Sequence, residues 1–263
     1  MERKSAADPI SHSADIVNDN IEKLKQLFPS VFTEGNIDFN ALKELLGDKV
    51  ETDPEYYRFT WPGKAMAKAE ARKPSRGTLR PVKDESVNWD TTENLYIEGD
   101  NLEVLKLLQK SYANKVKMIY IDPPYNTGKD FVYKDNYKDN LANYNEKFNR
   151  TDEEGNLKSS AAETNQEGSA RYHSNWLNMM YPRLTLARNL LTDDGVILIS
   201  IGDDELDNLK KVSDEIFGMD NFILTFSRAM KSGGAKGKFY TPSIDYILVY
   251  SKSKNEAKSF RNL

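Results

Sequence analysis

The sequence predicts an α/β fold: a mainly parallel β-sheet with helices on both faces, preceded by a small helical appendage. Apolar runs typical of buried strands alternate along the chain with segments whose apolar residues recur at helical spacing. The run from Val196 to Ile201 is continuous, as expected of a strand that is covered on both faces. Hydrophobic residues make up 38% of the 263 residues, which is enough to fill such a core.

The first 60 residues are predicted to form the helical appendage. Apolar residues recur at helical spacing from Ile16 to Phe28 and again from Asp38 to Leu46. Pro29 ends the first helix, and Gly47 is a natural C-terminal cap for the second. The polar residues before the first helix are expected to form a disordered tail.

Residues 61–92 are predicted to form a basic segment between the appendage and the main domain. From Lys64 to Lys83 the chain is rich in Ala, Lys, Arg and Pro and contains one acidic residue, Glu70. Two interpretations stay open: a solvated linker, or an arm whose cations contact phosphate groups. Because the net charge of the chain is -4, contact with nucleic acid would depend on local basic patches of this kind.

The main domain is predicted from residue 93 to residue 263. A short strand from Asn94 to Ile97 ends before Asp100, and Asn101 opens the helix that follows. A second strand runs from Lys117 to Ile121. The polar stretch at 126–170 is long, so it is interpreted either as a functional loop or as a disordered segment.

The later elements continue the alternation of helix and strand. Ser174 and Asn175 are predicted to cap one helix, and Asp203 to cap another that Gly218 closes. The segment 231–238 is rich in Gly and Lys and is interpreted as a mobile basic loop. The buried stripe of the first of these helices comprises Trp176, Leu177, Met180, Leu184, Ala187 and Leu191, and the strands are Val196–Ile201, Asn221–Phe226 and Tyr246–Tyr250.

The composition excludes several classes of site. The chain has no cysteine, which rules out disulfides and thiolate zinc sites. Its two histidines, His12 and His173, are too few for a convincing metal site. No apolar run is long enough to cross a membrane, and the N-terminus lacks the apolar stretch of a secretory signal. We therefore expect a soluble cytoplasmic protein with neither a metal nor a membrane partner.

The tetrapeptide Asp122-Pro123-Pro124-Tyr125 carries the strongest chemical signal. Two successive prolines fix φ at two positions and remove two backbone donors, so the neighbouring carbonyls project rigidly. The Asp122 carboxylate and the Pro123 carbonyl can each accept one N–H bond. The Tyr125 ring can stack on an aromatic face. This set suits an amino group on a planar heteroaromatic ring.

The position of the tetrapeptide favours a catalytic role. In isolation, Pro-Pro-Tyr is more typical of a stiffened turn or of a recognition ligand. Here Asp100 and Asp122 both follow predicted strands, and ligands of such sheets bind at the carboxyl ends of the strands. Two hydrogen bonds that draw the protons of an adenine amine out of the ring plane would favour its attack on a sulfonium methyl group.

From about Trp61 to Lys252 the chain resembles the modification (Mod) subunits of type III restriction-modification systems. These are adenine-specific DNA methyltransferases of the permuted β order. The two N-terminal helices are also similar to the leading segment of the family. The order of the similar stretches matters more than any one of them: Phe59–Lys64, Val87–Asn101, Ile119–Gly128, Trp176–Leu184, Gly195–Ile201 and Tyr246–Lys252.

The resemblance implies a Rossmann-like methyltransferase sheet and S-adenosylmethionine as the cofactor. It assigns catalysis to the residues from Asp122 to Tyr125, and it implies that Asp100 and Asn101 approach the adenosyl part of the cofactor. The alternative role for Asp100 is that of a helix N-cap. The implied partners are double-stranded DNA with a flipped adenine, a second Mod subunit in a dimer, and a helicase-nuclease restriction subunit.

The sequence departs from the family in one respect. The glycine-rich cofactor loop of the family, of the Phe-x-Gly-x-Gly type, follows the target-recognition region, and neither occurs before Leu263. The glycines at 233–237 are no substitute, and they form no Walker loop, because Phe239 stands where Ser or Thr is required. We therefore expect a truncated, incomplete methyltransferase sheet, and a chain that methylates poorly or not at all by itself.

Two other functions fit some features of the sequence. Methyltransferases that act on protein glutamine or on RNA carry similar motifs, but their glycine-rich loop precedes the motif. Residues 1–92 contain no such loop, which argues against them. The alternative that stays open is a non-catalytic fragment, a DNA-binding or assembly piece that a second polypeptide completes.

Overall fold

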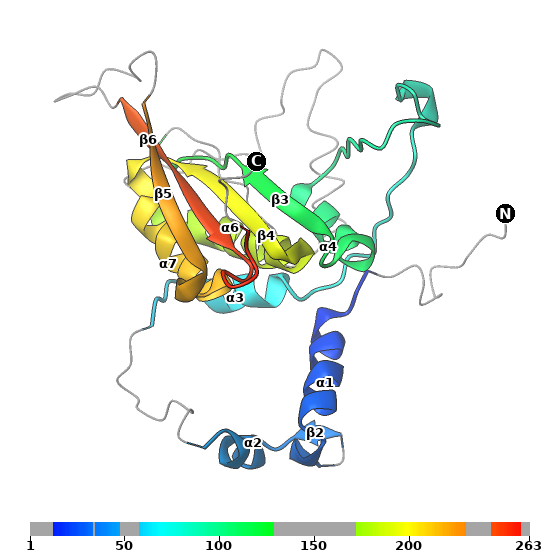
Figure 1. Cartoon of the computed structure of the whole chain (residues 1–263), viewed down its shortest axis with the longest axis vertical. Helices are drawn as coiled ribbons and strands as arrows, with labels where there is room; N and C mark the ends of the chain where they lie inside the picture. Colours follow the sequence, from blue (N-terminus) through cyan, green and yellow to red (C-terminus); the bar gives the residue numbers. More distant parts are fainter. Residues whose placement is uncertain (1–12, 34, 48–57, 129–171, 230–242, 259–263) are drawn as a thin grey trace.

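The computed structural model describes residues 13–33, 35–47, 58–128, 172–229 and 243–258 (Figure 1). Its main body is an α/β structure around a four-stranded sheet in the order β3-β4-β6-β5. The strands are β3 (Val116–Ile121), β4 (Leu191–Ile201), β5 (Phe222–Ala229) and β6 (Ile244–Ser251). Four of the five strands that the sequence predicts in the main domain are confirmed.

One of the three pairings in the described sheet is parallel. β3 pairs with β4 in parallel, whereas β6 runs antiparallel to both of its neighbours. The expectation of a mainly parallel sheet is therefore wrong for this part of the molecule. The sequence shows alternation of strand and helix up to β5, but β6 then runs back beside β5 and inserts between β5 and β4. Strands that return in this way pair antiparallel.

Helix α6 (Tyr172–Leu190) is the centre of a helix layer on one face of the sheet (Figure 1). Three helices pack against it, α3 (Lys64–Glu70), α4 (Asn101–Tyr112) and α7 (Leu206–Phe217). The core lies between these helices and the sheet, where Ile197, Ile199 and Ile201 of β4 are fully buried. None of the described helices combines the length and the apolar character needed to cross a bilayer.

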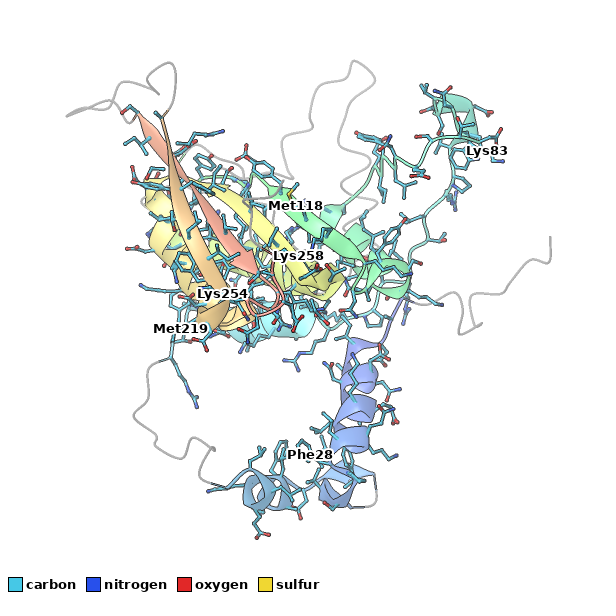
Figure 2. All side chains as sticks on the ribbon, viewed as in Figure 1. Phe28, Lys83, Met118, Met219, Lys254 and Lys258 are labelled. Atoms are coloured by element: carbon cyan, nitrogen blue, oxygen red, sulfur yellow. The ribbon has the colours of Figure 1, made fainter. Side chains whose placement is uncertain are left out.

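The opposite face of the sheet is less covered in the described part of the chain. The register of β3 and β4 places Met118 and Tyr120 on the face that does not carry the isoleucines of the core. Their side chains are 62% and 51% exposed, and Met118 is labelled in Figure 2. Helices were expected on both faces, but the described helices of the main body cover one, because all of them attach to α6.

The strand predicted from Asn94 to Ile97 is not formed. Residues 94–98 adopt neither helix nor strand, and Leu95 and Tyr96 are 70% and 92% exposed. The apolar residues of this stretch favour an extended chain, but a strand also needs a neighbour to take its hydrogen bonds. β3 is an edge strand whose described partner is β4 alone.

The ends of two helices differ from the prediction. Ser174 and Asn175 were predicted to cap a helix, but α6 is already helical at Tyr172. Asp203 was predicted to cap the next helix, but a 3₁₀ turn, η5 (Asp203–Glu205), comes first and α7 starts after it. Gly218 closes α7 as predicted, with φ of 93°. The predicted stripe of α6 is buried, although its last member, Leu191, begins β4.

The N-terminal appendage projects away from the sheet (Figure 1). Its two predicted helices are confirmed as α1 (Ile16–Leu27) and α2 (Phe39–Leu46). Asp15 caps α1 and Asp38 caps α2, each by accepting from a backbone N–H of the first turn. Between the helices lie η2 (Pro29–Val31) and a two-stranded ladder of β1 (Phe32–Thr33) and β2 (Asn36–Ile37), which the sequence did not predict.

The basic segment divides into two parts. Its first part belongs to the core, because α3 packs against α6 and the Trp61 indole donates to Asn178 of α6 over 2.8 Å. The interpretation as a solvated linker is therefore wrong for α3. From Arg76 to Tyr96 every residue is exposed, with one 3₁₀ turn, η4 (Lys83–Glu85). Lys83 lies away from the sheet (Figure 2).

A buried ion pair joins α3 to α4. The Lys106 ammonium lies 2.6 Å from a carboxylate oxygen of Glu70, and the two side chains are 2% and 1% exposed. Lys73 approaches the other oxygen of Glu70 at 2.8 Å. Burial opposes the charge on Glu70, but the hydrogen bonds from both lysines hold its pKa below the ordinary value. The pair therefore stays ionised inside the helix layer.

Replacing Lys106 by Met keeps the side-chain volume and removes the charge that faces Glu70. Breaking a buried pair leaves a poorly compensated charge, so we expect a loss of about 3 kcal/mol in the free energy of unfolding, measured by urea denaturation. The double variant Glu70→Leu, Lys106→Met removes both charges and should be closer to the unchanged chain. Equal losses in the single and double variants would contradict this account.

Candidate functional site

The predicted catalytic residues lie at the carboxyl edge of the sheet. Asp122 directly follows β3, and Gly202 directly follows the neighbouring strand β4. β6 is antiparallel to β4, so its first residues, including Asp245, reach the same edge. Three strands thus bring their ends together where this kind of fold places its ligands.

The turn from Asp122 to Tyr125 is accessible at this edge. Asp122 is exposed, and the three residues that follow are half-buried. Among the described residues, no hydrogen bond or ion pair reaches the Asp122 carboxylate or the Pro123 carbonyl. Within the described part of the chain, both acceptors that were predicted to bind an amino group are therefore available for one.

The main chain of the turn is held from the side of α6. The Trp176 indole N–H donates to the Pro124 carbonyl over 2.7 Å. The Tyr172 hydroxyl donates to the carbonyl of Asn126, the residue after the turn. The Asn126 amide donates to the buried carboxylate of Glu205. These bonds hold the turn on one side and leave the opposite side, with Asp122, facing outward.

Tyr125 is fixed by contacts at both the ring and the hydroxyl. The ring packs against Gly202, where an added Cβ would lie 3.0 Å from Cδ2 of the ring, so a larger residue would displace it. The hydroxyl donates to Asp245 over 3.3 Å. Asp245 is in turn bound by both ends of the Arg228 guanidinium, whose Nε lies 2.8 Å from Oδ1. Stacking of the Tyr125 ring on a base stays a prediction.

Burial and nearby negative charge make the Tyr125 hydroxyl harder to ionise. Burial is the larger cause, and the charges of Asp122 and Asp245 add to it, so the pKa of Tyr125 rises to about 12. The hydrogen bond and charge of Arg228 hold the pKa of Asp245 below its ordinary value. At neutral pH, Tyr125 is therefore a neutral donor to an ionised Asp245.

The residues predicted to approach the cofactor lie at the start of α4. Asp100 is the N-cap of that helix and accepts from the Glu103 N–H over 3.1 Å, which is the alternative role that the sequence suggested. The Asn101 side chain accepts from Nε of Arg183 over 2.8 Å. A role for Asp100 and Asn101 in cofactor binding stays a prediction.

Helix α6 ties the two predicted parts of the site together. Trp176 binds the motif and Arg183 binds Asn101. These two side chains are seven positions apart, so they lie on the same side of α6, about 10 Å apart along its axis. The predicted catalytic and cofactor-binding residues are therefore attached to one side of the same helix, about two turns apart.

Several residues of the site were not recognised in the sequence. Trp176 was predicted as core alone, although its indole also binds the motif. Glu205, Arg228 and Asp245 were not singled out. The acidic run from Asp203 to Glu205 begins two residues after a buried strand ends, at the edge where ligands bind. That position is the signal that was available in the sequence.

The chain belongs to a family of DNA methylases. Residues 116–262, more than half of the chain, match the family model described as DNA methylase. This match includes the Asp122–Tyr125 turn and the whole four-stranded sheet. The predicted membership in a DNA methyltransferase family is confirmed.

Within this family the chain is homologous to Mod subunits of type III restriction-modification enzymes. It is 40% identical over 238 residues to the EcoPI Mod subunit of Escherichia phage P1, which is 88% of this chain and 36% of that protein. It is 38% identical over 240 residues to the EcoP15I Mod subunit of Escherichia coli, 89% of this chain and 36% of that protein. The chain thus spans about a third of the length of these relatives.

Solved structures give a weaker likeness. One is the DNA modification methylase TTHA0409 of Thermus thermophilus, described as putative and complexed with S-adenosyl-L-methionine. It is 15% identical, with 62% of this chain and 55% of that chain covered and a TM-score of 0.36. The family of this chain is assigned from the match to the DNA methylase model and from the Mod relatives, and not from this structural likeness.

Replacing Asp245 by Asn removes the charge that faces the Tyr125 hydroxyl and leaves Arg228 beside it. The loss of the negative charge and the remaining positive charge of Arg228 both favour the phenolate of Tyr125. The pKa of Tyr125 should therefore fall from about 12 toward the ordinary value. Titration of the tyrosine ring-carbon NMR signals measures this pKa, and Tyr125→Phe assigns the signal. An unchanged pKa in Asp245→Asn would show that the described contact does not control Tyr125.

Proposed function

We propose that this chain carries the catalytic half of a site-specific DNA methyltransferase that modifies N6 of adenine, as the modification component of a restriction-modification system. The observation that carries the proposal is the Asp122–Tyr125 turn, whose main chain is bound on the side of α6 while its carboxylate faces outward. Membership in the DNA methylase family and homology to the Mod subunits support DNA as the substrate class.

The proposed chemistry follows from the properties of adenine. The lone pair of its exocyclic amine is delocalised into the ring, so the amine is a poor nucleophile. The Asp122 carboxylate and the Pro123 carbonyl accept its two N–H bonds and draw both protons out of the ring plane. This arrangement favours the tetrahedral nitrogen of the transition state and holds it for in-line attack. Tyr125 supplies an aromatic face for the purine.

The amine of a stacked adenine cannot reach such a turn. The proposed substrate is therefore double-stranded DNA from which the target adenine is flipped out. We propose that residues 93–263 form the catalytic domain, residues 1–60 the appendage, and residues 61–92 an arm that contacts phosphates. Exposed cations beyond α3, such as Arg76 and Arg80, support the last assignment.

S-adenosylmethionine is the cofactor that the proposed reaction requires, and it supplies the methyl group. The described residues do not by themselves fit the whole cofactor. Asp100 already caps α4, and Asn101 is bound by Arg183. The glycine-rich loop expected of the family is not in the 263-residue sequence.

The relatives are named as subunits of type III restriction-modification enzymes, which supports a restriction subunit as a partner in the complete system. That this subunit is a helicase-nuclease, and that the Mod subunit forms a dimer, we propose from the family resemblance alone. The second candidate function is a DNA-binding or assembly piece that a second polypeptide completes. The observation that favours it is that the chain spans 36% of the EcoPI and EcoP15I Mod subunits.

A chimera tests the proposed reaction. The matched 238-residue stretch of this chain replaces its counterpart in the EcoPI Mod subunit, and N6-methyladenine formed in DNA is measured by mass spectrometry. We expect the chimera to methylate, and Asp122→Asn to lower its rate by roughly 100-fold or more, because one acceptor becomes neutral.

The matched control for this chimera is Asp220→Asn, which changes an exposed carboxylate on η6 (Met219–Asn221), at the edge of the sheet opposite to Asp122. It should leave the rate unchanged. An Asp122→Asn chimera as active as its parent would contradict the proposal. The 263-residue chain alone should methylate poorly, and robust turnover by it would overturn the expected incompleteness of the cofactor pocket.

A further inference from the structure

A buried carboxylate lies behind the Asp122–Tyr125 turn and is not part of the proposed reaction. Glu205 is fully buried at the end of η5, four residues after the carboxyl end of β4. It accepts from the Asn126 amide and, at 2.8 Å, from the Asn208 amide. Its carboxyl group also lies 2.7 Å from Nδ1 of His173.

We propose that Glu205 is a positioning residue for the amine-binding turn, and this inference rests on the proposed function. By holding the side chain of Asn126, Glu205 fixes the chain just after Tyr125. The direction of the Pro123 carbonyl and of the Asp122 carboxylate depends on that anchor. Glu205 itself does not touch the substrate.

The backbone of the turn explains why an anchor is needed at Asn126. The two prolines restrict φ at positions 123 and 124, but rotation resumes at Tyr125. Asn126 has φ of 62°, in the left-handed region that asparagine tolerates better than most residues. Its carbonyl accepts from Tyr172 and its side chain donates to Glu205. Asn126 is therefore held on both its main chain and its side chain.

The contacts of Glu205 argue against a purely local role. Glu205 is the N-cap residue of α7, but its side chain makes no capping hydrogen bond to that helix. Instead it joins three separate elements: the turn after β3 through Asn126, the first turn of α6 through His173, and α7 through Asn208. Burying a carboxylate is costly unless several donors satisfy it, and here they do.

The same geometry predicts which substitutions preserve the anchor. Glu205→Gln keeps an oxygen for Asn126 and His173, and the Asn208 amide can flip to accept from the new NH₂ group. Glu205→Met keeps the volume and removes every acceptor. Asn126→Gly removes the tether from the other side while allowing the left-handed backbone. Asn208→Ala removes a contact of Glu205 that does not reach the turn.

The three tryptophans of the chain allow a direct measurement. In the ¹H–¹⁵N spectrum of the 263-residue chain, the Trp176 indole N–H reports its bond to the Pro124 carbonyl, and Trp176→Phe assigns it. The Trp61 indole, bound to Asn178 in the helix layer, is the internal control. The affinity for adenosine, from titration of the same spectrum, is the second readout.

We expect Glu205→Met and Asn126→Gly to shift the Trp176 indole signal, leave the Trp61 signal in place, and weaken adenosine binding roughly tenfold or more. Glu205→Gln should retain both properties. Asn208→Ala should lower the melting temperature without moving the Trp176 signal. If Glu205→Met does not fold, Asn126→Gly tests the same tether.

Two results would overturn the inference. One is an unmoved Trp176 signal in Asn126→Gly, and the other is a shift in Asn208→Ala as large as that in Glu205→Met. Failure of the unchanged chain to bind adenosine would count against the proposed function instead. The indole signals would still decide whether Glu205 positions the turn.

Discussion

The turn that follows β3 is bound through its main chain on the side of α6, and the chemistry of the site depends on that constraint. Trp176 binds the Pro124 carbonyl and Tyr172 binds the Asn126 carbonyl, while no described residue binds the Asp122 carboxylate. Two prolines alone would stiffen the chain without aiming it. The hydrogen bonds from α6 add direction to that stiffness, so the acceptors at 122 and 123 can be oriented before a ligand arrives.

Helix α6 transmits this constraint to the rest of the fold. It packs against the sheet and against the three other helices of the main body. Its first turns hold the motif, and Arg183 holds the start of α4. The buried pair of Glu70 and Lys106 fastens α3 to α4 within the same layer. A change that loosens this layer would therefore disturb the site without touching it.

Much of the fold could be predicted because it depends on local pattern. The apolar run from Val196 to Ile201 predicted the central strand, and the position of Asp122 after an apolar run predicted the edge where the site lies. The prediction of a strand at 94–97 was wrong, because a strand depends on a partner that local pattern does not reveal. The antiparallel entry of β6 was missed for a similar reason, since pairing is decided by tertiary neighbours.

The supporting residues of the site could not be predicted from spacing. Asn126 and Glu205 are 79 positions apart, and Pro124 and Trp176 are 52 apart. Nothing in either local stretch indicates its partner. Trp176 fits the apolar stripe of a helix equally well whether or not its indole binds the motif, so periodicity identified the helix and not the contact.

The central claim is that the turn recognises an exocyclic amine. Its most direct test is an NMR titration of the 263-residue chain with adenosine and, separately, with purine riboside, which has the same ring and sugar but no amine. The account predicts that adenosine perturbs the signals of Asp122 and Tyr125 and binds more tightly than purine riboside, and that Asp122→Asn removes the difference. Equal binding of the two nucleosides, or binding that leaves the turn unperturbed, would contradict it.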